Sequence, residues 1–386
     1  MKLRALAALL FVVATSGARA VILLETGDTE ANTTAPEGAL AGSGWQYQGV
    51  FGGFLGTPIA PRFFLSAKHV GNPGAISFGS ASYAVVAQFR DPTSDLAINQ
   101  VAQDLPIVAP LYTKSDEMGK HLVVIGRGTR RGGEMLLNGE LRGWAWGAGD
   151  GRQRWGENDV VQIVSFSSGP DDGIYATCDR PTAPAVLPNE SHLSVGDSSG
   201  AVFIQDGGTW KLAGINYAVD DLYFAPGGSG FTAAIFDARG YYSRTGPTTY
   251  DLLGGPVPVP TGFYATRVSS KLAWIYSVID PQGDADGNGT SNLLEYALRL
   301  NSTAADPDRQ AVVTHSASDI SFVYRKLTDA PSLQYQVEQS EDLRTWSPAA
   351  SQETLVGSAE NVATVNAKIT SVANGRAFLR LSVSQN

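Results

Sequence analysis

Short apolar runs separated by turn residues dominate the pattern of hydrophobic and polar positions in this chain. From Phe51 onward, runs of β-branched and aromatic residues alternate with clusters of Gly, Pro, Asn and Asp. Many short strands with such punctuation are typical of antiparallel sandwiches and barrels, so we predict a mainly β fold. The clearest strand candidates cover residues 60–65, 83–89, 121–125, 160–166, 201–204 and 212–217.

Two later segments have a helical period instead. In residues 269–279 apolar side chains recur at three- and four-residue spacing, with Ser269 or Ser270 as the expected N-cap. A second helix is expected over residues 291–300. Strand-like alternation then returns, which predicts a separate small β domain at 301–386 with strands at 320–325, 333–339, 362–369 and 377–383.

The composition supports a large, turn-rich globular protein. The 386 residues include 43 Gly and 20 Pro, and hydrophobic residues make up 43% of the chain. The net charge of -9 argues against nucleic acid or an anionic membrane as the main partner. Cys178 is the one cysteine, so no intrachain disulfide forms.

The first 20 residues have the three parts of a secretory signal. Lys2 and Arg4 precede an apolar run at 5–14, and a small-residue site follows that ends at Ala20. The alternative is a buried first strand. We expect cleavage after Ala20 and export to the cell surface, the periplasm or the extracellular space. No later run is long enough to form a transmembrane segment.

Ser198 occupies a small-residue turn, Gly196-Asp197-Ser198-Ser199-Gly200, directly before an apolar run. A nucleophilic serine needs such a tight turn, because its hydroxyl must point into a cleft and nearby N–H groups must converge on one spot. The same residues are also common in ordinary turns, so the turn alone does not establish catalysis.

A serine nucleophile needs a base, and the base needs an acid to orient it. His69 ends an apolar strand at a small-residue turn, and Asp95 stands at the head of another apolar strand, where a carboxylate is costly without a partner. The order His69, Asp95, Ser198 is therefore a candidate triad. The remaining histidines are His121, expected to be structural, His192, and His315 in the distal β domain.

Five segments resemble, in order, the sequence boxes of the trypsin/chymotrypsin family of serine proteases. Residues 65–69 (LSAKH), 94–98 (SDLAI) and 196–201 (GDSSGA) look like the boxes around that family's His, Asp and Ser. Residues 212–215 and 262–275 are similar to its pocket strand and to its last strand and helix. The resemblance covers residues 49–279 and implies two antiparallel six-stranded β-barrels, with a protease domain at 21–280.

The resemblance also implies roles for individual residues. Ser198 is the nucleophile, His69 the general base and Asp95 the group that orients it, while the N–H groups of Gly196 and Ser198 form an oxyanion hole. The implied activity is that of a secreted serine endopeptidase that cuts polypeptides through an acyl-enzyme. The alternative is an inactive homologue acting as a calcium-stabilised binding or adhesion protein. The implied substrate-pocket residues are His192, Tyr217, Val219 and Gly262.

Several positions depart from the family pattern. Ser199 replaces a Gly after the nucleophile and costs about 1 kcal/mol if that position needs a positive φ. An insertion at about 220–261 is expected to fold over the pocket rim. No acidic residue stands at the expected pocket base, so we favour a small, apolar or acidic residue before the cleaved bond. Signal cleavage would leave Val21 as the new N-terminus, and its amino group is a candidate partner for Asp197.

Residues 284–295 match the calcium-loop pattern D-x-[DN]-x-[DN]-G-x5-E at every position. With the two flanking helices, the loop resembles an EF-hand, and we predict a structural Ca²⁺ joint at 281–300. The alternative is an acidic turn. The tail resembles C-terminal modules of secreted bacterial proteins, for which surface or matrix attachment is a hypothesis. The predicted calcium ligands are Asp284, Asp286, Asn288, Thr290, Asn292 and Glu295.

Overall fold

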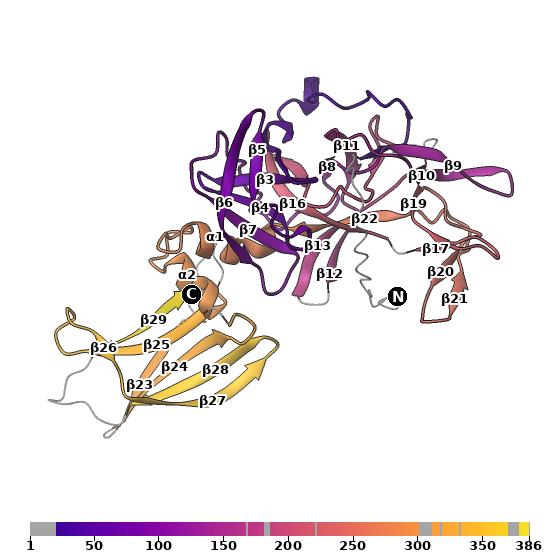
Figure 1. Cartoon of the computed structure of the whole chain (residues 1–386). Helices are drawn as coiled ribbons and strands as arrows, with labels where there is room; N and C mark the ends of the chain where they lie inside the picture. The colour runs from indigo at the N-terminus through magenta and orange to yellow at the C-terminus, as the bar shows by residue number, and fades with distance from the viewer. Residues whose placement is uncertain are drawn as a thin grey trace. The chain divides into compact units, whose positions relative to one another are not determined.

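The fold is taken from a computed structural model, which describes residues 21–166, 169–180, 186–220, 222–300, 311–316, 319–331, 333–369 and 378–385. The predicted signal segment, residues 1–20, lies outside the described residues. The chain divides into two compact units, Met1–Ser270 (unit 1) and Lys271–Asn386 (unit 2) (Figure 1). The domain boundaries at residues 280 and 300 stay predictions.

The first half of unit 1 is a closed six-stranded barrel, which confirms one of the two predicted barrels. Its core contains Phe51, Phe64 and Ile76. The predicted single strand at 60–65 is wrong, because Pro61 and Arg62 form a turn that divides it. In barrel order the strands are β2 (Gly49–Phe51), β3 (Phe54–Ala60), β4 (Phe63–Ala67), β7 (Leu96–Val101), β6 (Ala81–Arg90) and β5 (Ala75–Phe78).

The second half of unit 1 contains a seven-stranded antiparallel sheet where the second six-stranded barrel was predicted. Alternate residues of its strands, such as Leu122, Val124 and Val202, are fully buried in one apolar core. The sheet order is β11 (Arg154–Asp159), β8 (His121–Gly126), β15 (Ala201–Asp206), β16 (Thr209–Val219), β22 (Gly262–Arg267), β13 (Gly169–Thr177) and β12 (Gln162–Phe166).

The predicted insertion at about 220–261 contains short strands that pair with one another and with an earlier hairpin of the chain. Four short strands pair in the order β18 (Gly230–Phe231), β17 (Tyr223–Phe224), β20 (Tyr242–Arg244) and β21 (Tyr250–Leu252). A second sheet has the order β19 (Ala233–Ile235), β10 (Glu140–Trp146) and β9 (Arg131–Leu137).

The chain segment that follows the predicted cleavage point is firmly packed in unit 1. Strand β1 (Ile22–Leu23) pairs with β14 (Ser191–His192), just before the Ser198 turn. Ile22 and Leu24 are buried in a cluster with Trp144 and Phe236. This segment therefore joins the region of the Ser198 turn to β10 and to the segment around β19.

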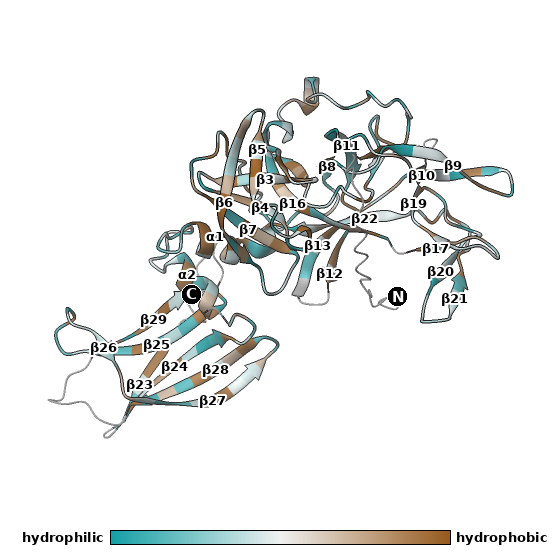
Figure 2. Cartoon of the chain, viewed as in Figure 1, coloured by the Kyte–Doolittle hydropathy of each residue, from teal (hydrophilic) through white to brown (hydrophobic). Residues whose placement is uncertain are grey.

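Unit 2 contains both predicted helices, α1 (Leu272–Ile279) and α2 (Asn292–Leu298). The serine N-cap is wrong, because a 3-10 turn at Ser269–Lys271 precedes α1 and Lys271 is its N-cap. Hydrophobic and hydrophilic residues are interspersed along β24, β25 and β28 (Figure 2). The sheets are β23 (Val312–His315), β24 (Ile320–Leu327), β28 (Val362–Ile369) and β27 (Ser351–Ala359), and β26 (Ser347–Pro348), β25 (Leu333–Ser340) and β29 (Phe378–Gln385).

Within the described residues, no helix has the length and apolar character needed to cross a membrane.

Candidate active site

Two neighbouring strands of the barrel bring His69 and Asp95 together. His69 lies in the 3-10 turn that follows β4, and Asp95 immediately precedes β7. Ala67 and Leu96 are paired across these antiparallel strands, so the residues beyond the strand ends meet at one edge. The Lys68 N–H donates to the Asp95 carbonyl at 2.6 Å, which fastens the two turns to each other.

The three candidate side chains form a continuous hydrogen-bonded relay. Ser198 Oγ lies 2.8 Å from His69 Nε2, and His69 Nδ1 lies 2.5 Å from Asp95 Oδ2. The second carboxylate oxygen of Asp95 accepts the backbone N–H of His69 at 3.0 Å. Because the Asp95 carboxylate accepts a hydrogen bond from the Nδ1–H group, Nε2 is left as an acceptor that faces the serine hydroxyl. The relay can therefore deprotonate Ser198.

Two backbone donors lie beside the Ser198 hydroxyl. In the described part of the chain, neither the Gly196 N–H nor the Ser198 N–H donates a hydrogen bond to another group. Gly196 has a φ of 92°, which a residue with a side chain rarely adopts. The turn thus keeps two N–H groups available next to Ser198 Oγ, where an oxyanion would need them.

Ser199, which stands where the serine protease family has a Gly, adopts the positive φ for which a cost was expected. Its φ of 67° lies in the left-handed region, so that prediction is confirmed. The side chain is fully buried, and its hydroxyl donates to the Leu55 carbonyl at 2.6 Å while accepting the Ala67 N–H at 3.0 Å. Its own N–H donates to the Asn216 carbonyl at 3.0 Å. Ser199 therefore ties the nucleophile turn to β3 and β4 of the barrel and to β16 of the sheet.

Asp197 is buried directly behind the nucleophile. Its carboxylate accepts the Gly128 N–H at 2.6 Å, the Ser194 N–H at 2.8 Å and the Ser194 hydroxyl at 2.9 Å. The backbone N–H of Val21 also reaches this carboxylate. Burial raises the pKa of Asp197 to about 7, although the hydrogen bonds act in the opposite direction.

The predicted pocket residues fall into two places. Tyr217 lies beside the triad, with its ring edge-on to His69 at 6.2 Å. Val219 pairs with Phe263, next to Gly262, across β16 and β22. His192 is fully buried: its Nδ1 donates to the Leu193 carbonyl at 2.6 Å, and burial lowers its pKa to about 4, so the ring is neutral.

Sequence reasoning missed two residues that shape the region around Gly262. The Tyr175 ring is so close that a methyl group at Gly262 would lie 2.4 Å from it. Asp220 accepts the hydroxyls of Tyr175 at 2.9 Å and Tyr264 at 2.7 Å, and the Gly262 N–H at 2.7 Å. Neither residue lies in a recognisable motif, so only the β13–β22 pairing could have pointed to Tyr175.

The acidic loop of unit 2 has the turn geometry that its pattern requires. Gly289 has a φ of 87°, and its N–H donates to Asp284 Oδ2 at 2.7 Å. Asn288 Nδ2 donates to Glu295 Oε1 at 2.9 Å, and Glu295 is fully buried. Among the residues that the structure describes, no three His, Cys, Asp or Glu side chains gather as a metal site. Any cation here would need the oxygens of Asn288, Thr290 and Asn292 as well.

Comparisons with solved structures find similar folds among proteases. The active form of the Rv3671c protease from M. tuberculosis is 16% identical, over 59% of this chain and 89% of that one, with a TM-score of 0.31. The NS6 protease from murine norovirus 1 is 16% identical, over 55% and 98%, with a TM-score of 0.28. The HtrA-type protease AlgW is 12% identical, over 84% and 82%, with a TM-score of 0.33.

No protein-family model matches the chain, and no curated protein matches it. Functional conclusions therefore rest on the geometry of the site.

Proposed function

We propose that the protein is a serine endopeptidase that hydrolyses peptide bonds through Ser198, His69 and Asp95. The observation that carries this proposal is the relay from Ser198 Oγ through both ring nitrogens of His69 to Asp95, at 2.8 and 2.5 Å. A serine hydroxyl, an imidazole and a carboxylate in this order are the parts that nucleophilic acyl transfer requires.

In this mechanism Ser198 Oγ attacks the peptide carbonyl carbon while His69 Nε2 takes the hydroxyl proton. The N–H groups of Gly196 and Ser198 stabilise the oxyanion, and each such donor contributes on the order of 3 kcal/mol. His69 then gives its proton to the departing amine, which leaves an acyl group on Ser198. Water, deprotonated by His69, releases the acid. Asp95 holds the ring in the tautomer that both steps need.

A fluorophosphonate label tests the proposal, because an activated serine displaces its fluoride and stays covalently attached. We expect labelling of the full chain, none of Ser198→Ala, and undiminished labelling of a matched control at an exposed serine, Ser80→Ala. Hydrolysis of a casein substrate should follow the same order. A failure of Ser198 to label would reject the enzyme and favour the inactive, partner-binding homologue.

We further propose that the enzyme accepts small side chains before the cleaved bond. Support comes from the Tyr175 ring, which occupies the space in front of Gly262. A panel of peptide substrates that differ only at this residue should give the highest kcat/KM for Ala or Ser. Equal rates for Phe and Ala would contradict a narrowed pocket.

We also propose export after cleavage at Ala20, a structural Ca²⁺ and attachment through the β tail. The calcium proposal is supported by the donor set, since Asp284, Asp286, Asn288 and Glu295 offer the hard oxygens that Ca²⁺ prefers. The carbonyl of Thr290 and the side chain of Asn292 would complete it. Millimolar Ca²⁺ should raise the melting temperature of the protein but not of Asp284→Ala, whereas Mg²⁺ should have less effect.

A further inference from the structure

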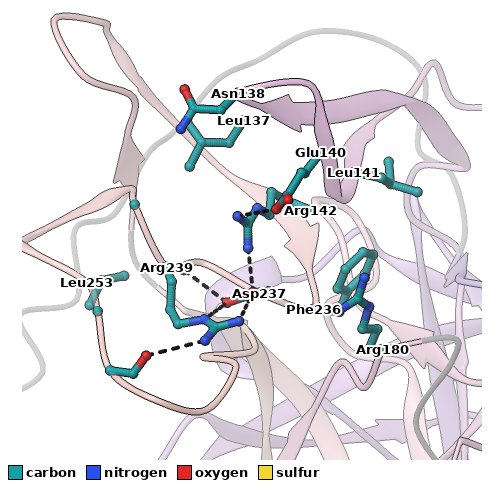
Figure 3. A pocket seen from close by; sticks show the side chains of 13 residues that line it. Leu137, Asn138, Glu140, Leu141, Arg142, Arg180, Phe236, Asp237, Arg239 and Leu253 are labelled. Atoms are coloured by element: carbon teal, nitrogen blue, oxygen red, sulfur yellow. Dashed lines mark hydrogen bonds and ion pairs between the residues drawn. The ribbon is translucent and has the colours of Figure 1, made fainter.

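A cavity of about 770 Å³ lies in unit 1 between the β9–β10 hairpin and the predicted insertion, and none of the candidate triad residues lines it (Figure 3). Its walls come from the tip of the β9–β10 hairpin, the loop after β19 and the segment after β21, and Arg180 adds a side chain from the segment after β13. A cavity of this size suits a drug-sized ligand.

Three arginines and two carboxylates line this cavity. Asp237 is buried and accepts Arg142 Nη1 at 2.5 Å and Arg239 Nη2 at 2.6 Å. Glu140 accepts Arg142 Nη2 at 2.8 Å. In Figure 3, Arg142 and Arg239 both reach Asp237, and Glu140 lies beside Arg142. Both carboxylates of the lining are therefore already engaged.

Arg180 also lines the cavity but takes no part in these ion pairs. Among the described residues no carboxylate pairs with Arg180, and its guanidinium lies 5.7 Å from the centre of the Phe236 ring. The Nε–H of Arg142 is also buried and donates to no described group. Three guanidiniums against two carboxylates give the lining one net positive charge, in a chain whose total is -9.

The lining also includes four apolar side chains. Leu137, Leu141 and Leu253 line the cavity together with Phe236. A guanidinium binds a carboxylate through two parallel hydrogen bonds, and these apolar side chains favour a ligand that carries a hydrophobic group near that charge. A bare inorganic anion would leave the four apolar side chains uncovered.

We propose that the cavity binds a carboxylate attached to an apolar residue, in the form of the free C-terminus of a polypeptide. Arg180 holds the carboxylate, and the leucine and Phe236 side chains contact the last residue. The volume exceeds what one amino acid fills, which favours a peptide over a single free acid. This site does not depend on Ser198, so it can be tested whether or not the chain is an enzyme.

The binding test uses the full chain carrying Ser198→Ala, which prevents turnover, and isothermal titration. The probes are acetyl-Ala-Ala-Ala-Ala-Leu with a free carboxyl group, the same peptide as its C-terminal amide, N-acetyl-leucine and inorganic phosphate. We expect the free-acid peptide to bind at least tenfold more tightly than each of the others.

Arg180→Gln should weaken binding of the free-acid peptide about tenfold. The affinity of Arg180→Lys should lie between those of Arg180→Gln and the unsubstituted Arg180, because an ammonium keeps the charge but loses the paired hydrogen bonds. Arg90→Gln, at an exposed arginine outside the cavity, should change nothing. Unchanged melting temperatures would show that each variant is folded. Equal binding of acid and amide, or no effect of Arg180→Gln, would overturn the site. Equal binding of phosphate or N-acetyl-leucine would overturn the peptide terminus as its ligand.

Discussion

Two of the buried aspartates of unit 1 lie in opposite electrostatic settings. Asp197 precedes Ser198 and Asp237 lines the arginine-lined cavity, and each is only 1% exposed. Burial raises the pKa of Asp197 to about 7. Burial acts on Asp237 in the same direction, but hydrogen bonds from Arg239 outweigh it and lower that pKa to about 2.

The difference lies in whether the partners carry charge. The closest donors to Asp197 are neutral, namely backbone N–H groups and the Ser194 hydroxyl. Asp237 meets two guanidiniums. Neutral donors satisfy the hydrogen-bonding capacity of a buried carboxylate without repaying the loss of hydration of its charge. Asp237 thus contacts two cations directly, whereas Arg154 lowers the pKa of Asp197 only through space and the Val21 N–H that reaches Asp197 is neutral.

The largest expected effect is a dependence of the free energy of unfolding on pH, caused by the raised pKa of Asp197. Its folded-state pKa of about 7 lies above the unfolded value of about 3.9, so the folded protein holds this proton more tightly. The associated stability is full below about pH 4 and is lost as pH rises to about 7, on the order of 4 kcal/mol. Urea unfolding at a series of pH values should show this slope, and Asp197→Asn should reduce it.

A free amino group at Val21 should give Asp197 a cationic partner, as Arg142 and Arg239 do for Asp237. A chain that begins at Val21 would place an ammonium at this carboxylate, lower its pKa and remove the slope between pH 4 and 7. The control is the same chain with Val21 acetylated, which should keep the slope. Glu190, whose pKa burial raises to about 8, contributes equally in all these proteins. An identical slope with and without the free amine would contradict the pairing.

Removing Asp237 should have the next largest effect. Asp237→Ala leaves Arg142 and Arg239 without their buried partner, and breaking such a pair costs about 3–5 kcal/mol. We expect about 3 kcal/mol, since the two arginine side chains stay 16% and 28% exposed. Unfolding in urea at pH 7 measures the loss.

Asp206→Ala is the matched control for Asp237→Ala. Asp206 also pairs with two cations, Lys114 and Lys211, but its side chain is 17% exposed whereas that of Asp237 is 2% exposed. The loss of stability should be much smaller, because water replaces the carboxylate. Similar losses in the two variants would show that burial does not set the strength of the Asp237 pairs.

The sequence predicted those parts of the molecule whose contacts are made by neighbouring elements with a clear local pattern. His69 and Asp95 each follow or precede a barrel strand, so the pairing of β4 and β7 was enough to bring them together. Apolar spacing also indicated the mainly β class and both helices. The six-stranded barrel, by contrast, was implied by the resemblance of the sequence boxes to those of serine proteases.

The parts that the sequence did not predict depend on contacts between distant segments. The arginine-lined cavity brings the β9–β10 hairpin and Arg180 together with residues 236–255 of the insertion, and none of these segments contains a motif. Tyr175 reaches Gly262 only because β13 pairs with β22. The seven-stranded sheet differs from the expected barrel because, among the described strands, its edge strands β11 and β12 do not pair with each other.

The smallest effect concerns Ser199, where strain and hydrogen bonding oppose each other. Ser199→Ala keeps the φ of 67° but leaves the Leu55 carbonyl and the Ala67 N–H without their partner, so we expect a loss of about 2 kcal/mol. Ser199→Gly relieves the strain and should lose only about 1 kcal/mol. Urea unfolding and kcat should both rank the proteins as wild type, Gly, Ala. A Gly variant more stable than wild type would mean that the strain outweighs both hydrogen bonds.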